Sequence, residues 1–268
     1  MAIVLKSQYT EIVKMFNRLR GKYQLWKIWQ DAITLYACAI SNTVDSRYRE
    51  EREAQYIRII GKYSRDEAAV FPQIFAEIVE QLERDPEQDF LGDLYMQLEL
   101  GSHWHGQFFT PYSVCQAMAE INFRQEITEA SKVKPVTVCD PACGGGATLI
   151  AAAHAFRRSI RQTGLNPQYY LCIFAQDISP VVAMMCYVQI SLQGYAGKIK
   201  IADTLTDPLT DMDNGADIWY TPMWFSDAWT IRRLLAQNAK ERMTCRKSIS
   251  ASAMTADGRT TSRPTEQT

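Results

Sequence analysis

The stretch Val136-Thr-Val-Cys-Asp-Pro-Ala-Cys-Gly-Gly-Gly-Ala147 decides the fold class. It joins a β-branched run, Val136–Cys139, to three consecutive glycines and then to an alanine-rich stretch over 147–163. β-Branched residues favour strands and alanine favours helices, so the pattern predicts a strand, a tight turn and a helix. Glycines at such a turn permit positive φ and let a ligand lie against the main chain. A glycine-rich turn is a weak signal by itself, and no Lys-Ser/Thr pair follows that would indicate a nucleotide triphosphate loop.

Residues downstream of this turn continue the alternation of strands and helices. The sequence predicts strands over 170–175, 198–201 and 218–220, and a helix over 181–192. Such alternation is typical of an α/β domain in which helices cover a parallel sheet. Ligands of these sheets bind beyond the carboxyl ends of the strands, so we expect the site at that edge.

Two further acidic residues follow predicted strands. Asp177 lies in Phe174-Ala-Gln-Asp-Ile178, and Asp203 lies in Ile201-Ala-Asp-Thr204. A carboxylate at the first position can accept hydrogen bonds from both hydroxyls of a ribose, and one at the second can accept from an adenine amino group. Each acid alone is more typical of an ordinary surface loop. Together with Asp140 they give three acid-bearing loops in order, which favours an adenosine-containing cofactor.

A second motif, Gly106-Gln-Phe-Phe-Thr-Pro111, lies upstream of the glycine turn. Thr110 and Pro111 are suited to be the N-cap and the first residue of a helix. That helix would run through three apolar residues, Val114, Met118 and Ile121. Capping explains the threonine and the proline, but it does not explain the aromatic pair Phe108 and Phe109. An aromatic pair beside a glycine would suit a wall around a purine or a methionine moiety.

The chain divides into three expected regions. Residues 1–100 carry apolar side chains at helical spacing, notably over 23–40 and 70–82, and predict a helical N-terminal region. Residues 101–237 carry the motifs described above and predict the ligand-binding domain. Residues 238–268 are rich in Ser, Thr, Arg and Ala, and their six basic against three acidic residues give a net charge of +3. This composition predicts a disordered basic tail.

Two features of the first region have ordinary structural explanations. Trp26, Trp29 and Tyr36 lie among aliphatic residues, and we expect them to pack in a core rather than bind a ligand. The charged stretch Asp45–Arg58 is typical of a helix face that water solvates.

The composition excludes several classes of protein. At 268 residues and 47% hydrophobic, the chain can bury one substantial core or two small ones. Its net charge of -1 argues against a protein that coats nucleic acid generally. Seven cysteines at irregular spacing, with no secretion signal, predict free thiols in a reducing cytoplasm. No apolar run is long enough to span a membrane, so we expect no membrane association.

A metal site is not expected from the sequence. The candidate ligands, none of them at the spacing of a zinc site, are His103, His105, Cys115, Cys139 and Cys143.

Taken together, the two motifs resemble the catalytic domain of N6-adenine DNA methyltransferases, especially the modification subunits of type I restriction systems. Those proteins carry Gly-Gln-(Phe/Tyr)-(Phe/Tyr)-Thr-Pro ahead of Asp-Pro-x-Cys-Gly-(Ser/Thr/Gly)-Gly, as residues 106–111 and 140–146 do here. Phe90-Leu-Gly-Asp-Leu-Tyr95 also resembles the family's approach to its first motif, and the similarity extends over residues 90–235. The resemblance implies a Rossmann-like parallel sheet, S-adenosyl-L-methionine as cofactor, and methyl transfer to adenine N6 in DNA.

The resemblance also implies which residues contact the cofactor and which partners the chain has. The residues that would line the cofactor site are Phe108, Thr110, Pro111, Asp140, Ala142, Gly144, Gly146, Asp177 and Asp203. The family's core sheet has seven strands, whereas this chain has room for about four before its polar tail, so we expect an incomplete sheet. DNA is the implied partner, with a specificity subunit or another restriction-modification subunit supplying target recognition.

The catalytic motif departs from the family pattern, which is Asp/Asn/Ser-Pro-Pro-Tyr/Phe/Trp after the fourth strand. Here the corresponding segment is Tyr220-Thr-Pro-Met-Trp-Phe225. By the resemblance, the Thr221 hydroxyl and the Pro222 carbonyl would accept the two adenine amino hydrogens, and Trp224 would stack on the extruded base. A hydroxyl is a shorter and weaker acceptor than an amide or carboxylate, and losing such a partner costs about 2–4 kcal/mol of transition-state stabilisation. We therefore expect activity from slow to absent.

Two alternative functions stay open from the sequence. A methyltransferase-like protein could bind cofactor, DNA or a restriction subunit without transferring a methyl group, as Thr221 and Met223 suggest. A protein-glutamine or RNA methyltransferase would share the aromatic-ended motif, although Gly106–Pro111 belongs to the DNA group.

Overall fold

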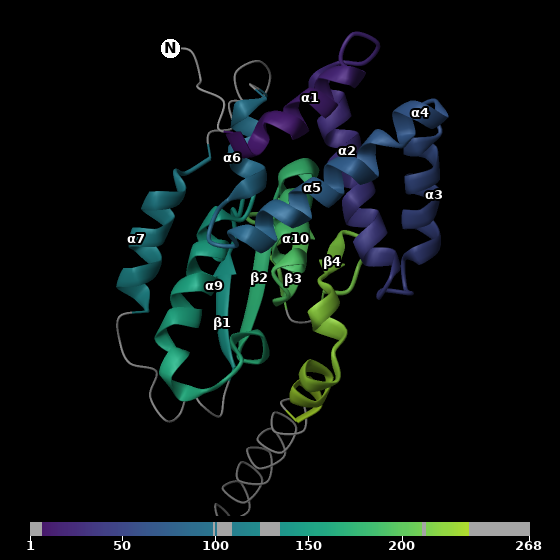
Figure 1. The fold of residues 1–268 in the computed structure, drawn as a ribbon. Coiled ribbons are helices and arrows are strands. Elements are labelled where there is room, and N and C mark those ends of the chain that lie inside the picture. Colours follow the sequence, from purple (N-terminus) through teal and green to yellow (C-terminus); the bar gives the residue numbers. More distant parts are fainter. Residues whose placement is uncertain (1–6, 99, 101–108, 124–134, 211–212, 236–268) are drawn as a thin grey trace, which may run out of the picture. The chain divides into compact units, whose positions relative to one another are not determined.

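The computed structural model describes residues 7–98, 100, 109–123, 135–210 and 213–235. Residues Met1–Ser226 form one compact unit (Figure 1), and Asp227–Thr268 form a second, of which 227–235 are described and helical. The basic tail expected over 238–268 lies outside the described residues.

The N-terminal part of the first unit is helical. After a 3-10 turn at Ser7–Tyr9, its helices are α1 (Thr10–Leu19), α2 (Leu25–Asn42), α3 (Arg49–Ile60), α4 (Arg65–Ala68), α5 (Val70–Arg84) and α6 (Phe90–Gln97). The helices expected over 23–40 and 70–82 are thus α2 and α5. Trp29 and Tyr36 are buried in the core, as expected, whereas the Trp26 side chain is 46% exposed.

The charged stretch Asp45–Arg58 is not wholly a solvated face, because Asp45 and Arg52 are buried. The Arg52 Nη1 atom lies 3.1 Å from Asp45 Oδ2, and Nη2 donates to the carbonyl of Ile218 at 2.8 Å. Tyr48 also donates a hydrogen bond to the carbonyl of Asn214. The expectation of a solvated face was wrong for Asp45 and Arg52, because charge at helical spacing does not show which side chains have a buried partner.

The second half of this unit is an α/β layer built on four strands. They are β1 (Val136–Asp140), β2 (Leu171–Asp177), β3 (Ala196–Ile201) and β4 (Ile218–Tyr220), in the order β1-β2-β3-β4. The first three strands are parallel, as the sequence predicts. Their connecting helices, α9 (Ala147–Ser159) and α10 (Pro180–Leu192), contact each other and pack side by side against the sheet (Figure 1). The α2 helix packs on the outer side of α10 and so adds a further layer.

The fourth strand runs antiparallel to β3, and this differs from the fully parallel sheet expected. Lys198 pairs with Tyr220 and Lys200 with Ile218. Arg52 on α3 bonds to Ile218 on β4, and Tyr48, just before α3, bonds to Asn214 in the loop before β4. These two contacts hold β4 and its preceding loop against α3. Because β4 runs in the opposite direction, Thr221 lies beside Gly197 at the amino end of β3.

Helix α7 (Tyr112–Asn122) packs on α9. Its N-cap is Pro111 in an extended conformation, with no side-chain cap, so the expected cap at Thr110 is wrong by one residue. Helix α7 buries its small residues Cys115 and Ala119. Its larger apolar residues are exposed, namely Val114, Met118 and Ile121. Small residues let α7 approach α9 closely, which turns the larger side chains outward.

The six cysteines within the described residues are free thiols, in agreement with the sequence. A search of the same residues finds no helix with both the length and the apolarity that a membrane crossing needs.

Candidate functional site

The glycine turn after β1 is held by its own polar side chain. Asp140 Oδ1 accepts a hydrogen bond from the Ala142 amide at 3.0 Å, and Asp140 Oδ2 accepts one from the Thr148 hydroxyl. Gly146 has a φ of +97°, and a Cβ placed there would lie 2.9 Å from Cys186 Sγ. Glycine is therefore required at Gly146 both by the backbone conformation and by the close approach of α10.

The loop after β2 contacts this turn directly. The Asp177 carboxylate accepts a hydrogen bond from the Gly144 amide through Oδ2 at 2.9 Å and one from the Ser179 amide through Oδ1 at 2.8 Å. The Cys143 amide donates to the carbonyl of Gln176 at 2.9 Å. Each carboxylate oxygen can accept a second hydrogen bond, so Asp177 keeps the capacity to bind a ligand.

The loop after β3 is attached to the same place. The Thr204 hydroxyl donates to the carbonyl of Pro141, and the Leu205 amide donates to Asp203 Oδ1 at 2.9 Å. Underneath, the buried Gln176 side chain donates to the carbonyls of Ala202 and Asp207. The structure thus brings together the acid-bearing loops that follow three neighbouring parallel strands. We call this region, with Asp140, Asp177 and Asp203, the carboxyl edge of the sheet.

An aromatic ring lies over the glycine turn. A Cβ placed on Gly144 would be 3.5 Å from the Phe109 ring, which also packs edge-on against Tyr95 at a centroid distance of 5.3 Å. The neighbouring Phe108 lies outside the described residues. Thr110 and Pro111 are exposed just before α7. Of the aromatic pair in the upstream motif, Phe109 is therefore the ring that the structure places beside the turn.

The segment Thr221–Trp224 lies elsewhere. Thr221 is fully buried, its Oγ1 accepts from the Gly197 amide at 2.8 Å, and its hydroxyl donates to the carbonyl of Tyr195 at 2.7 Å. Both partners lie at the amino end of β3. The structure therefore does not bring Thr221 together with the residues of the carboxyl edge. The cause is the antiparallel direction of β4.

The other two residues of the expected catalytic motif belong to a short 3-10 turn, Pro222–Phe225. The Trp224 ring packs against Tyr220 at a centroid distance of 5.1 Å and against Phe174 on β2 at 6.2 Å. This turn directly follows Thr221, which lies at the amino end of β3.

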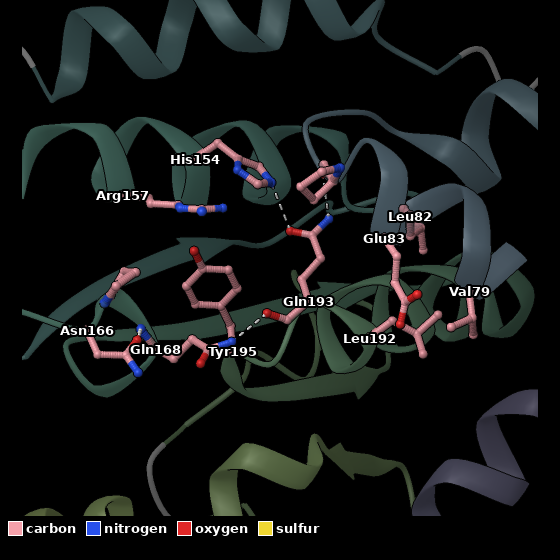
Figure 2. Close-up of a pocket in the computed structure, with 12 residues that line it drawn as sticks. Val79, Leu82, Glu83, His154, Arg157, Asn166, Gln168, Leu192, Gln193 and Tyr195 are labelled. Carbon is pink, nitrogen blue, oxygen red and sulfur yellow. Dashed lines mark hydrogen bonds between the residues drawn. The ribbon is translucent and has the colours of Figure 1, made fainter. Parts of the chain in front are cut away.

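A cavity of about 420 Å³ opens at the amino end of the strands (Figure 2). Gln193 crosses it, with Oε1 3.2 Å from His154 Nε2, and its main-chain carbonyl accepts from the Gln168 amide group at 3.1 Å. Burial lowers the pKa of His154, and the nearby Glu87 carboxylate opposes that shift. None of the site residues expected from the sequence lines this cavity, and its two glutamine side chains bond to main-chain carbonyls and to His154.

Two buried residues near the turn escaped the sequence analysis. Gln189 on α10 donates to the carbonyl of Gly145 at 2.9 Å and to Asp89 Oδ1 at 2.8 Å. The signals in the sequence are a single amide, Gln189, in the mostly apolar helical stretch Val181–Leu192 and an Asp directly before the helix that begins at Phe90.

Within the described part of the chain, no group of His, Cys, Asp and Glu side chains could hold a metal ion. His103 and His105 lie outside that part.

Two solved structures are similar to this chain. One is described as a class I S-adenosylmethionine-dependent methyltransferase from Listeria monocytogenes, with 14% identity, a TM-score of 0.41, and coverage of 77% of this chain and 57% of that one. The other is the type I restriction-modification system methyltransferase subunit from Streptococcus thermophilus, with 22% identity, a TM-score of 0.40, and coverage of 78% and 41%. The chain thus spans about half the length of these proteins. Among curated proteins, no match was found.

A family model also matches the chain. The model described as N-6 DNA Methylase matches residues 87–256, which is more than half of the sequence. The match includes β1, the glycine turn, and the loops that carry Asp177 and Asp203. This chain belongs to the N-6 DNA methylase family.

Proposed function

We propose that the carboxyl edge binds S-adenosylmethionine and that the chain takes part in methyl transfer to adenine N6 in DNA. S-Adenosylmethionine is the cofactor of the family to which the chain belongs. The observation that carries the proposal is the meeting of three loops at one edge, through the Gly144–Asp177 and Thr204–Pro141 hydrogen bonds. Ligands of open α/β sheets bind at this position.

The side chains at this edge fit the chemistry of that cofactor. Asp177 accepts hydrogen bonds from two backbone amides and keeps further lone pairs, which can accept hydrogen bonds from the hydroxyls of the ribose. Asp203 uses Oδ1 for the Leu205 amide and can accept from the adenine amino group through its remaining lone pairs. Phe109 supplies an apolar face beside the glycines.

The glycine turn itself fits the methionine part of the cofactor. Gly144 and Gly146 both have positive φ, and neither adds a side chain to the turn. The buried Gly145 amide makes no hydrogen bond within the described residues, and we propose it as a donor to the cofactor carboxylate. We propose Asp140, Ala142, Gly144, Gly146, Asp177 and Asp203 as the cofactor-binding residues, with Phe108, Thr110 and Pro111 contributing from the upstream motif.

The transfer step makes a second demand on the protein. The lone pair of the adenine amino group is delocalised into the ring, so two acceptors must hold its hydrogens while the nitrogen attacks the methyl carbon. When bound, the cofactor supplies that methyl group from its sulfonium. Thr221, Pro222 and Trp224 are the residues that occupy the position of the family's catalytic motif, and we propose them as candidates for contact with the adenine.

The position of Thr221 favours a second candidate function. Its hydroxyl is already used in two buried hydrogen bonds, at the opposite edge of the sheet from Asp140. In the second candidate, the chain binds the cofactor and transfers no methyl group by itself. A partner chain, such as a specificity or other restriction-modification subunit, would supply the adenine site and the target recognition.

Two experiments test these candidates in turn. In isothermal titration with S-adenosylmethionine we expect saturable binding, and absence of binding at millimolar cofactor would overturn the shared part of both. Transfer of tritiated methyl groups to unmethylated DNA then decides between them. Transfer by the chain alone supports the first candidate, and transfer only when a partner chain is added supports the second.

A Thr221→Val variant sharpens the second experiment, because valine keeps the shape of threonine and removes the hydroxyl. If the chain transfers methyl groups and the variant loses that activity while still binding cofactor, Thr221 is an acceptor for the adenine. If transfer persists, the adenine is held by other residues.

A further inference from the structure

A fully buried amide lies beneath the glycine turn. Gln189 is a fully buried amide in α10, among the buried apolar residues Val188 and Ile190. Its Nε2 atom donates to the carbonyl of Gly145 at 2.9 Å and to Asp89 Oδ1 at 2.8 Å, while Oε1 accepts from the Leu91 amide at 3.0 Å. Both amide hydrogens and the carbonyl oxygen therefore have partners, so the usual penalty for burying an amide is avoided.

The partner of this amide, Asp89, fixes the start of α6. Asp89 Oδ1 accepts from the Gly92 amide at 3.0 Å as well as from Gln189. The carboxylate lies so close to Gly92 that a Cβ there would be 2.0 Å from Oδ2. The start of α6 is thus bonded to both Asp89 and Gln189, and Gln189 is also bonded to the glycine turn.

The glycine turn depends on outside contacts for its position. Gly145 lies between two glycines of positive φ, and three adjacent glycines give the main chain more conformational freedom than any other sequence. On the α10 side, the Gly145 Cβ position is 3.4 Å from Met185 Cε and 3.8 Å from Asp89 Oδ1. The hydrogen bond from Gln189 to the Gly145 carbonyl is the polar contact that fixes the turn from this side.

We propose that Gln189 is a positioning residue, which holds the glycine turn in its ligand-binding conformation and joins it to the start of α6 through Asp89. The part of this inference that concerns cofactor affinity rests on the proposed function. The part that concerns the conformation of the turn does not. An amide of this length can make all three bonds at once, whereas Leu makes none of them and Glu cannot donate to the Gly145 carbonyl.

The first measurement is hydrogen–deuterium exchange of the full chain without cofactor. In Gln189→Leu we expect exchange over residues 143–147 to rise by on the order of tenfold, because the turn loses its buried anchor. Gln193→Leu is the matched control, since Gln193 is the next residue after α10 and bonds to His154 and the Pro86 carbonyl. The control should leave exchange at 143–147 unchanged.

Asp89→Asn is the conservative variant that separates positioning from general damage. Both hydrogen bonds to Asp89 end on Oδ1, which Asn retains, so the turn should exchange as in the wild type. If Gln189→Leu fails to fold, Gln189→Glu takes its place, because it keeps the size of the side chain and the acceptor for Leu91. Unchanged exchange at 143–147 in whichever of the two Gln189 variants folds would overturn the proposal.

The second measurement is titration with S-adenosylmethionine. We expect Gln189→Leu to bind at least about tenfold more weakly, with Gln193→Leu and Asp89→Asn within about twofold of the wild type. Wild-type protein that binds no cofactor would contradict the proposed function and leave the exchange result to decide on Gln189. Normal affinity in Gln189→Leu, with wild-type binding intact, would contradict the role of Gln189 alone.

Discussion

The two edges of the central sheet use polar residues in opposite ways. At the carboxyl edge, Asp177 bonds to one amide of the glycine turn and one of its own loop, Asp203 bonds to an amide of its own loop, and both keep lone pairs available. At the amino edge, the Thr221 hydroxyl is fully buried, and it both donates and accepts a hydrogen bond within the fold. Gln193 is likewise engaged by His154 and by the Pro86 carbonyl. A polar residue that the fold has satisfied stabilises the protein, and one with spare capacity can also bind a ligand.

This difference follows from the direction of the chain. Parallel strands bring every βα loop to one edge, so three acids spread over the sequence meet there. The antiparallel β4 delivers its following residues to the other edge. The difference between the edges also leads to the predictions below, each of which changes a residue at one of the two edges.

The largest effect is expected from Gly146→Ala. A side chain there would combine a φ of +97° with a contact of 2.9 Å to Cys186 Sγ. We expect the free energy of unfolding to fall by about 2–4 kcal/mol in urea titrations, with loss of cofactor binding. Gly164→Ala is the matched control, since its φ is +71° but nothing lies within 4 Å, and strain alone should cost about 1 kcal/mol. Equal costs at the two positions would contradict the packing of the turn on α10.

The next effect concerns cofactor affinity. In Asp177→Asn, the new amide group must face either the Gly144 or the Ser179 amide, so one hydrogen bond becomes a repulsion. We expect titration with S-adenosylmethionine to show affinity lower by about tenfold to a hundredfold. Asp66→Asn, on the exposed first turn of α4, serves as the control. An affinity for Asp177→Asn equal to that of this control would move the ribose site away from β2.

Thr221→Val tests the amino edge. The change removes two buried hydrogen bonds and leaves the Gly197 amide without its acceptor, so it should cost about 1–2 kcal/mol of unfolding free energy. Cofactor affinity should stay within about twofold of the wild type. A marked loss of cofactor affinity without loss of stability would contradict the separation of Thr221 from the carboxyl edge.

The smallest effect is a pH dependence at the cavity. Burial holds the pKa of His154 below its ordinary value, with Glu87 acting against the shift and Arg157 acting with it. The unfolded chain therefore binds the proton more readily, so this contribution to stability is present above about pH 6.5 and is lost as the pH falls. His154→Gln should show a smaller drop in melting temperature between pH 7.5 and pH 5 than the wild type. An identical drop would mean that other groups account for it.

The sequence predicted most of the elements that carry the carboxyl edge. The strand at 218–220 has the expected bounds, and β1, β2 and β3 lie within two residues of theirs. β-Branched runs, glycine turns and apolar helices are local signals, so they can be read without the rest of the fold. The meeting of Asp140, Asp177 and Asp203 then follows from the parallel connection alone.

The remaining features depend on contacts between distant residues. The direction of β4 is set partly by Arg52, which lies 166 residues before its partner Ile218. The burial of Thr221 follows from that direction. Which side of α7 faces outward depends on its contact with α9. The small residues Cys115 and Ala119 of α7 are buried in that contact. The contacts of Arg52 and Thr221 leave no periodic pattern in the sequence.

The most direct test of the central claim is a comparison of hydrogen–deuterium exchange with and without saturating S-adenosylmethionine. We predict protection at the glycine turn and at the loops after β2 and β3, over residues 140–147, 177–179 and 203–206. We predict no change at the amino edge, over residues 193–197 and 221–225. Protection confined to the amino edge, with the glycine turn unaffected, would contradict the assignment of the cofactor to the carboxyl edge.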